Sequence, residues 1–232
     1  MQNLAIIPAR CGSKGLKDKN IRLLNDKPLL AYTIEAAIES RMFSHIHVST
    51  DSEVYAGIAT EYGAEVPFLR SEEHATDTAT TADVIRFVIA RYQNYGLKFD
   101  TFAVLQPTSP LRTAKDIKAA YKLLFDKNAK SVVSVCEADH SPLWMNTLPE
   151  DLSLNGFLPV EGRKCRQELP VFYRINGAIY ISDCNEYLIN PDFYHEYGYA
   201  YVMDKRHSID IDDLVDFKLA EAILQEEMSK RL

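Results

Sequence analysis

The feature that most constrains the fold is an alternation of short apolar runs and amphipathic segments along the first 136 residues. The apolar runs predict buried strands at 3–8, 45–50, 66–69, 101–106 and 131–136. Apolar residues spaced three and four positions apart predict helices at 28–40, 52–62, 81–95 and 114–126. Strand, loop and helix in repetition favour an α/β fold, with a doubly wound, mostly parallel sheet covered by helices on both faces.

The alternation stops at residue 137 and returns near residue 175. Residues 137–174 are rich in proline and glycine and carry the only tryptophan, Trp144. A plain connection in a compact domain is much shorter, so we expect an inserted lid or extension with its own role. Short apolar runs at 177–181 and 200–203 and a helix at 214–228 complete the pattern. We therefore expect one α/β domain from residues 1–136 and 175–232, interrupted by a small insertion.

Composition excludes several classes of protein. The chain is 47% hydrophobic and 25% charged, which is typical of a globular protein and not of a disordered one. A net charge of −7 disfavours a general nucleic-acid or membrane-surface binder. No apolar stretch approaches the roughly 20 residues of a membrane span, and no two of the four cysteines form a CxxC pair. We expect a cytoplasmic protein without a membrane or nucleic-acid partner.

A basic loop follows the first predicted strand. Arg10, Lys14 and Lys19 supply three cations, and Gly12 and Gly15 let backbone N–H groups approach a ligand closely. Because ligands of parallel sheets bind at the carboxyl ends of strands, the loop is a candidate phosphate site. The spacing matches neither GxxxxGK[ST] nor GxGxxG, so a solvated basic loop stays open as the alternative.

An aspartate pair lies just before the last predicted helix. Asp210 and Asp212 point to the same side of an extended segment, an arrangement that suits Mg²⁺ held together with substrate phosphates. The alternative is that Asp212 or Asp213 caps the helix.

Two further segments carry polar or basic side chains. Residues 105–112 end a predicted strand, and Gln106, Thr108, Ser109 and Arg112 could present donors to a ligand, although the pattern alone favours a turn and helix cap. The basic group at 163–166, with Arg174 downstream, could clamp a carboxylate, although in isolation a charged surface is favoured.

Taken together, the segments resemble one family. In order they read IIPARxGSKGxxxKN, PLLAYTIEAA, VSTDS, GAEVPFLR, LQPTSPLR, SVVSV, NGAIYIS and SIDID. The pattern is similar to that of the acylneuraminate cytidylyltransferases over nearly the whole chain. The Kdo cytidylyltransferases share the early PAR motif but lack the GSKG form and the SIDID ending.

The resemblance implies a Rossmann-like α/β domain with a small dimerisation extension exchanged between the subunits of a homodimer. It implies that CTP and a nine-carbon α-keto acid sugar, typically N-acetylneuraminate, react with Mg²⁺ to give CMP-sugar and pyrophosphate. Legionaminic or pseudaminic acid is the alternative substrate. A non-catalytic nucleotide-binding module is the alternative from another class.

The resemblance also implies roles for individual residues. The CTP phosphates would be held by Arg10, Gly12, Ser13, Lys14, Gly15, Lys19 and Asn20. Cytosine and ribose would be surrounded by Pro8, Ala9, Arg70, Ala79 and Thr81. The sugar would be contacted by Gln106, Tyr180, Arg174, Phe193, Tyr194 and Arg166, the last from the partner subunit. Mg²⁺ would be bound by Asp210 and Asp212, and the catalytic residues would be Arg10, Lys19 and Asp210.

Two departures from the family pattern concern the loop and the insertion. Some members have a lysine at the position of Trp144, where it reaches the neighbouring active site. Lys17-Asp18 replaces a proline-containing pair before Lys19, which predicts a less rigid loop.

Overall fold

A computed structural model describes residues 1–12, 15–71, 73 and 80–230. The strands are β1 (Asn3–Pro8), β2 (Leu23–Leu24), β3 (Lys27–Pro28), β4 (His45–Ser49), β5 (Thr101–Val104), β6 (Ser131–Glu137), β7 (Tyr173–Asp183) and β8 (Gly198–Val202). The α-helices are α1 (Leu29–Ser40), α2 (Glu53–Glu61), α4 (Thr81–Asn94), α5 (Ala114–Asp126), α6 (Cys184–Ile189) and α7 (Leu214–Ser229). The 3₁₀ helices are η1 (Lys19–Ile21), η2 (Pro142–Trp144), η3 (Glu161–Arg163), η4 (Arg166–Glu168) and η5 (Lys205–Ser208).

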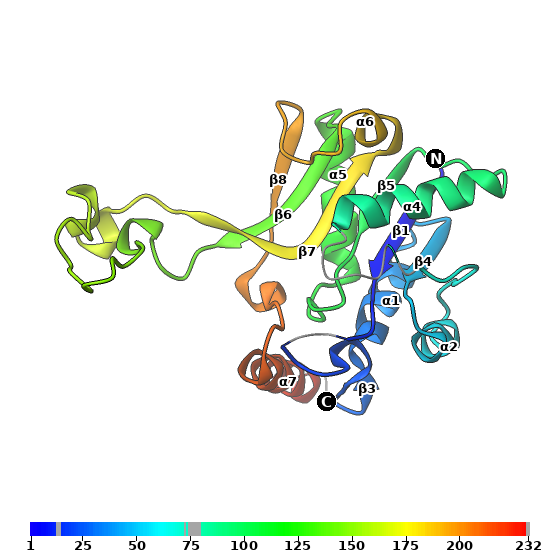
Figure 1. The fold of residues 1–232 in the computed structure, drawn as a ribbon, viewed down its shortest axis with the longest axis horizontal. Coiled ribbons are helices and arrows are strands. Elements are labelled where there is room, and N and C mark those ends of the chain that lie inside the picture. Colours follow the sequence, from blue (N-terminus) through cyan, green and yellow to red (C-terminus); the bar gives the residue numbers. More distant parts are fainter. Residues whose placement is uncertain (13–14, 72, 74–79, 231–232) are drawn as a thin grey trace.

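Six strands form one sheet in the order β4-β1-β5-β7-β6-β8 (Figure 1). Strand β1 is parallel to β4 and β5, and β6 is parallel to β8, whereas β7 runs antiparallel to both of its neighbours. The prediction of a mostly parallel α/β sheet is confirmed. The short strands β2 and β3 pair separately.

Helices cover both faces of the sheet. On one face, side chains of α1, α2 and α5 pack on Ala5, Ile7 and Ala103. On the other face, α4 and α6 pack on Leu4, Ile6 and Phe102. The alternation of strand residues between two buried clusters explains why these strands are apolar throughout. A third cluster joins Phe217 of α7 to Ile211 and Leu24, which fixes the last helix beside the carboxyl ends of the strands.

Two local predictions need correction. Residues 66–69 form no strand; only an isolated bridge joins Glu65 to His47. Pro67 lacks the N–H that a ladder needs, and the apolar run instead contributes Phe68 to a buried cluster. Helix α6 was not predicted, although its cap is local, since the Asp183 side chain accepts a hydrogen bond from the Glu186 N–H at 3.0 Å.

The segment between β6 and β7 projects away from the sheet as an arm, which we define as residues 138–172 (Figure 1). Within these residues only Gly162 is buried. The Trp144 Nε1–H donates to the Gly162 carbonyl at 2.8 Å, so Trp144 ties η2 to η3 inside the arm. None of the described helices is long and apolar enough to cross a bilayer.

Candidate functional site

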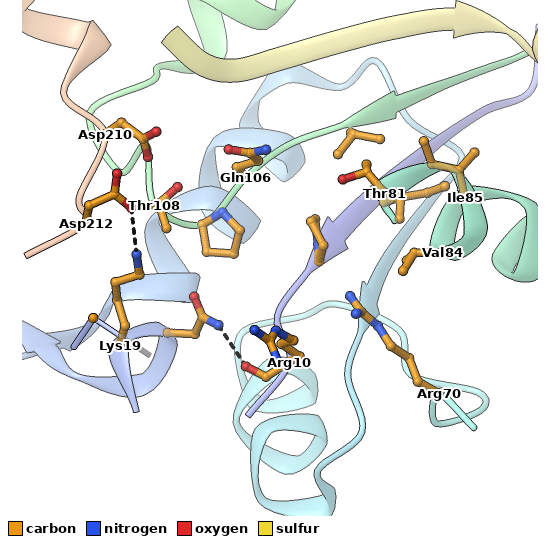
Figure 2. Close-up of a pocket in the computed structure, with 16 residues that line it drawn as sticks. Arg10, Lys19, Arg70, Thr81, Val84, Ile85, Gln106, Thr108, Asp210 and Asp212 are labelled. Carbon is orange, nitrogen blue, oxygen red and sulfur yellow. Dashed lines mark hydrogen bonds and ion pairs between the residues drawn. The ribbon is translucent and has the colours of Figure 1, made fainter. Parts of the chain in front are cut away.

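A cavity of about 510 Å³ opens at the carboxyl ends of β1 and β5 (Figure 2). Its walls come from the loop after β1, the loop after β5, the start of α4 and the segment before α7. Of the residues that the sequence predicted, it is lined by Pro8, Arg10, Gly15, Lys19, Asn20, Arg70, Thr81, Gln106, Asp210 and Asp212. Motifs spread over two hundred residues therefore meet at the edge where ligands of parallel sheets bind.

The basic loop after β1 is tied to the aspartate segment. The Lys19 ammonium donates to the Ile211 carbonyl and lies 3.4 Å from Asp212 Oδ1. A Cβ on Gly15 would lie 2.6 Å from the Asp212 carbonyl oxygen, so only glycine permits this approach. Asn20 Nδ2 donates to the Arg10 carbonyl at 3.2 Å. Lys19 thus holds the basic loop directly against the acidic segment at one end of the cavity.

Asp51 holds the other side of this loop. It accepts hydrogen bonds from the Cys11 N–H at 2.8 Å and from the Cys11 thiol at 3.2 Å. The hydrogen bond to Asp51 raises the pKa of the Cys11 thiol. Asp18 adopts φ +51°, a backbone conformation closed to the proline that other family members have in this pair. Its side chain accepts a hydrogen bond from the Tyr55 hydroxyl. These contacts join residues distant in sequence, so the loop pattern gave no signal for them.

The opposite end of the cavity is less polar (Figure 2). Val84 and Ile85 of α4 form an apolar wall beside Thr81. The Arg70 guanidinium is largely buried, and its Nε donates to Ser49 Oγ at 2.8 Å. Burial lowers the pKa of Arg70 to about 10, and its buried Nη2 has no hydrogen-bond partner among the described residues. A ring with polar edges could lie on the apolar wall and accept from this guanidinium.

Asp210 and Asp212 lie beside Lys19 at the other end (Figure 2). Burial raises the pKa of Asp210, whereas the Asp212 side chain is 83% exposed. The N–H groups of Val215 and Asp216 donate to Asp213, so Asp213 caps α7. The capping interpretation therefore holds for Asp213 and is wrong for Asp212.

The aspartate pair fits a divalent cation that binds together with a phosphorylated substrate. Asp210 Oδ1 is buried and has no hydrogen-bond partner among the described residues. Within those residues no group of three or more His, Cys, Asp or Glu side chains could hold a metal ion. Two carboxylates with the remaining ligands left to phosphate and water are what Mg²⁺ accepts.

The loop after β5 serves two purposes. Gln106 and Thr108 line the cavity, whereas Ser109 and Arg112 are buried beneath it. Arg112 Nη1 donates to the carbonyls of Gln106 (3.2 Å) and Ala178 (3.1 Å), which pins the loop to β7. Arg112 is therefore a structural residue here, as the pattern alone favoured.

Five other predicted residues are described by the structure but do not line this cavity: Ala9, Gly12, Tyr180, Phe193 and Tyr194. Ala9 is buried in the core and donates its N–H to the Ser49 carbonyl, and Gly12 has φ +80°. Tyr180 and Phe193 have ring centroids 5.4 Å apart, and burial raises the pKa of Tyr180 to about 12. Tyr194 follows them and is exposed.

The two predicted sugar-binding arginines are separated. Arg174 on β7 donates to the Ser208 carbonyl at 3.3 Å, close to the aspartate segment. Arg166 lies on the arm, where its Nη2 donates to the Asp139 carbonyl, and it does not line the cavity. Ser13, Lys14 and Ala79 lie outside the described residues.

Comparisons with known proteins agree on the family. A family model described as Cytidylyltransferase matches residues 4–156. An N-acylneuraminate cytidylyltransferase of Escherichia coli is 44% identical over 99% of this chain, which spans 54% of that relative's length. A CMP-N,N'-diacetyllegionaminic acid synthase of Legionella pneumophila is 38% identical over 97% of both chains.

A solved structure supports the fold. A CMP:2-keto-3-deoxy-manno-octonic acid synthetase complexed with CTP covers 98% of this chain, with a TM-score of 0.74 and 13% identity. The chain spans about half the length of the E. coli relative and nearly all of the Legionella one. The family that the eight sequence segments predicted is confirmed: the chain belongs to the cytidylyltransferase family.

Proposed function

We propose that this protein transfers the CMP group of CTP to a nonulosonic acid, most simply N-acetylneuraminate, and releases pyrophosphate. The observation that carries the proposal is the cavity in which the loop bearing Arg10 and Lys19 faces Asp210 and Asp212. A cation-rich end beside a carboxylate pair suits a triphosphate with its metal. The apolar wall at the other end suits a base.

The nucleotide would lie along the cavity from the apolar wall to the basic loop. Cytosine and ribose contact Pro8, Arg70 and Thr81, with the Ala9 backbone beside them. The phosphates contact Arg10, Lys19 and Asn20, together with the backbone of the loop at Gly12 and Gly15. The roles of Ser13, Lys14 and Ala79 follow from the family pattern alone.

Mg²⁺ would be held by Asp210 and Asp212. When bound, it would neutralise phosphate charge and lower the pKa of an anomeric hydroxyl that contacts it. Two carboxylates near one another would favour the dication over an empty site.

The sugar would attack the α-phosphorus of CTP directly through its anomeric hydroxyl, so no covalent enzyme intermediate is needed. Arg10 and Lys19 stabilise the charge that spreads onto the phosphates, and alignment supplies much of the remaining rate. Burial raises the pKa of Asp210, which makes this carboxylate a better proton acceptor than an exposed one. Asp210 therefore either accepts the hydroxyl proton or holds the metal that lowers its pKa.

The sugar site would lie around Gln106, Tyr180 and Arg174, with Phe193 and Tyr194 near the N-acyl group. Gly177 supports this placement, because its missing Cβ leaves room for Gln106 Oε1 and Asp210 Oδ2. Legionaminic or pseudaminic acid would use the same reaction. The Legionella relative, named for a legionaminic acid product, keeps that alternative open.

The active form would be a homodimer in which the arm of one subunit completes the cavity of the other. Apolar side chains along the arm are open to solvent in a single chain, with Met145 at 59%, Leu154 at 68% and Val160 at 77% exposure. Covering such a surface favours association. Arg166 would then reach the sugar of the partner subunit. The four unpaired cysteines fit a reducing, cytoplasmic location.

The test is pyrophosphate release from CTP with a panel of N-acetylneuraminate, legionaminic acid, pseudaminic acid and Kdo. We expect one nonulosonic acid to exceed Kdo by at least about a hundredfold in kcat/KM, because buried polar groups penalise a mismatched substrate. CTP binding without pyrophosphate release from any acid would favour the non-catalytic module and contradict the proposal.

A further inference from the structure

Asn176 occupies an irregular place in β7. Val133 pairs with Tyr180 and Val135 pairs with Ile175, so the stretch of β7 that contains Asn176 is longer than the stretch of β6 that it faces. The extra residues form a bulge, and bulges often aim side chains at functional sites. Asn176 is 1% exposed, so its amide side chain is inside the protein.

The amide of Asn176 uses all of its hydrogen-bonding capacity. Its Oδ1 accepts from Ser134 Oγ at 2.6 Å and from the Ala178 N–H at 3.2 Å. Its Nδ2 donates to Ser208 Oγ at 2.9 Å and to Met203 Sδ at 3.3 Å. The side chain therefore joins the sheet to the segment that leads into the two aspartates.

Ser208, which accepts the hydrogen bond from Asn176, lies two residues before Asp210. It is fully buried, and its hydroxyl also donates to the Asp204 carbonyl at 2.7 Å. Further along, the Ile211 N–H donates to the Thr108 carbonyl at 2.8 Å. Asp210 thus lies between two fixed points, one at Ser208 and one at Ile211.

Gly177, the next residue in the bulge, faces Asp210 from the sheet side. It has φ +75°, and a Cβ there would lie 3.2 Å from Asp210 Oδ2 and 2.8 Å from Gln106 Oε1. The bulge therefore anchors the aspartate segment through the Asn176 side chain. It also leaves room for the Asp210 carboxylate, because Gly177 has no side chain.

We propose that Asn176 is a positioning residue that, through Ser208, sets the place of Asp210 and so the affinity of the aspartate pair for a divalent cation. The inference rests on the proposed function for the identity of the cation site. Asn176 does not line the cavity, so it acts through the backbone of the segment.

The test measures Mn²⁺ binding by electron paramagnetic resonance in the presence of CTP and without any acid sugar, so no turnover is involved. The variants are Ser208→Ala, Asn176→Ala and the double variant. We expect each single variant to weaken Mn²⁺ binding about tenfold, as loss of groups that orient metal ligands does. Because both act through one hydrogen bond, the double variant should be no weaker than the worse single variant.

Thr101→Val is the matched control. Thr101 Oγ1 makes buried hydrogen bonds with Asn3 Oδ1 (2.9 Å) and the Tyr121 hydroxyl (3.2 Å) at the start of β5, the end away from Gln106. We expect this variant to melt at a lower temperature and to bind Mn²⁺ as the wild type does. Ser208→Ala carries the test alone if Asn176→Ala does not fold.

Unchanged Mn²⁺ binding in Ser208→Ala, an equal loss in Thr101→Val, or no Mn²⁺ binding by the wild type would each overturn the inference. Failure of the proposed function has a different signature. In that case the wild type binds Mn²⁺ and CTP and the variants weaken Mn²⁺ binding, yet no acid in the panel gives pyrophosphate.

Discussion

The sheet domain and the arm differ in how much apolar surface they bury. The sheet domain places Ile7, Phe102 and Phe217 in three separate buried clusters. The arm buries only Gly162 of its own residues and leaves side chains such as Leu148 and Leu152 exposed. The cavity can therefore form within one chain, whereas the arm has no core of its own.

The largest expected effect tests whether the chemistry belongs to the sheet domain. Asp210→Asn or Asp212→Asn should lower turnover at fixed Mg²⁺ on the order of a hundredfold or more, because charge stabilisation in the transition state is lost. The fold should be nearly unaffected, since neither residue caps α7. Turnover and melting temperature are measured on the same samples.

Asp213→Ala is the control for this pair. It removes the cap of α7 and should cost about 1 kcal/mol of stability while leaving turnover within a few-fold of the wild type. Near-normal activity with a clearly lower melting temperature in Asp210→Asn or Asp212→Asn would contradict the assignment of a metal-binding role.

The second prediction tests whether the arm completes a partner's cavity. Arg10→Ala and Arg166→Ala should each be inactive alone. Equal mixing after subunit exchange should restore about a quarter of wild-type activity, because half of the dimers then carry one intact site. Sedimentation velocity at low micromolar concentration should show a dimer.

A fully active monomer would contradict this prediction, and so would a mixture that stays inactive although subunits exchange. Either result would place the whole site within one chain. The arm would then need another explanation for its exposed apolar side chains.

A smaller effect concerns acid stability of the sheet domain. His47 is fully buried, and desolvation, with Arg70 nearby, lowers its pKa to about 3. In the unfolded chain His47 takes up a proton as the pH falls below about 6.5, whereas in the folded chain it stays neutral. The free energy of unfolding is therefore highest above that pH and decreases below it. The loss approaches about 1.4 kcal/mol per pH unit.

His47→Phe should remove this pH dependence because phenylalanine does not titrate. The site should accept a phenylalanine ring, since the His47 ring already packs against Phe68 and Tyr92. Urea unfolding of both proteins at pH 7.5 and pH 5 measures it. An identical drop in both proteins would show that other groups cause the acid sensitivity.

The smallest effect concerns the ion pair between His207 in η5 and Asp116 in α5, 3.1 Å apart. The Asp116 carboxylate raises the pKa of His207, and, against the effect of burial, His207 and the hydrogen bonds from Thr113 lower the pKa of Asp116. The histidine's contribution is full below its unfolded pKa and lost as pH rises through the raised value. The aspartate's contribution is present above its unfolded pKa and lost as pH falls through the lowered value.

His207→Gln should therefore destabilise the protein most near pH 5 to 6, by about 1 kcal/mol or less, and less at pH 9. Thermal unfolding across this range measures the difference. A difference that stays constant with pH would mean that packing and not charge is lost.

Periodicity predicted the sheet domain well because its helices are amphipathic and locally capped. Helix α5 begins and ends at the predicted residues, and Thr113 and Asp116 form its capping box. The predicted strand at 66–69 was wrong because Pro67 lacks the N–H that a ladder needs, although the run is apolar. Periodicity gave no prediction inside the arm, whose short 3₁₀ helices have no buried face to repeat.

The site was predictable as a set of motifs but not as a geometry. Loops after parallel strands meet at one edge, which explains why Arg10 and Gln106 line the same cavity. Which carboxylate caps α7 depends on where the helix starts, and that left Asp212 and Asp213 undecided. The contacts of Asp51 with Cys11 and of Asn176 with Ser208 join distant segments, which no local pattern reveals.

The most direct test of the account is the choice of nucleotide. Pyrophosphate release is measured with the preferred acid and each of CTP, UTP, ATP and GTP at equal concentration. The account predicts that CTP exceeds the others by at least about a hundredfold in kcat/KM, because the buried Arg70 Nη2 would stay unpaired against another base. Comparable turnover with UTP would contradict the claim that this cavity is built for cytidylyl transfer.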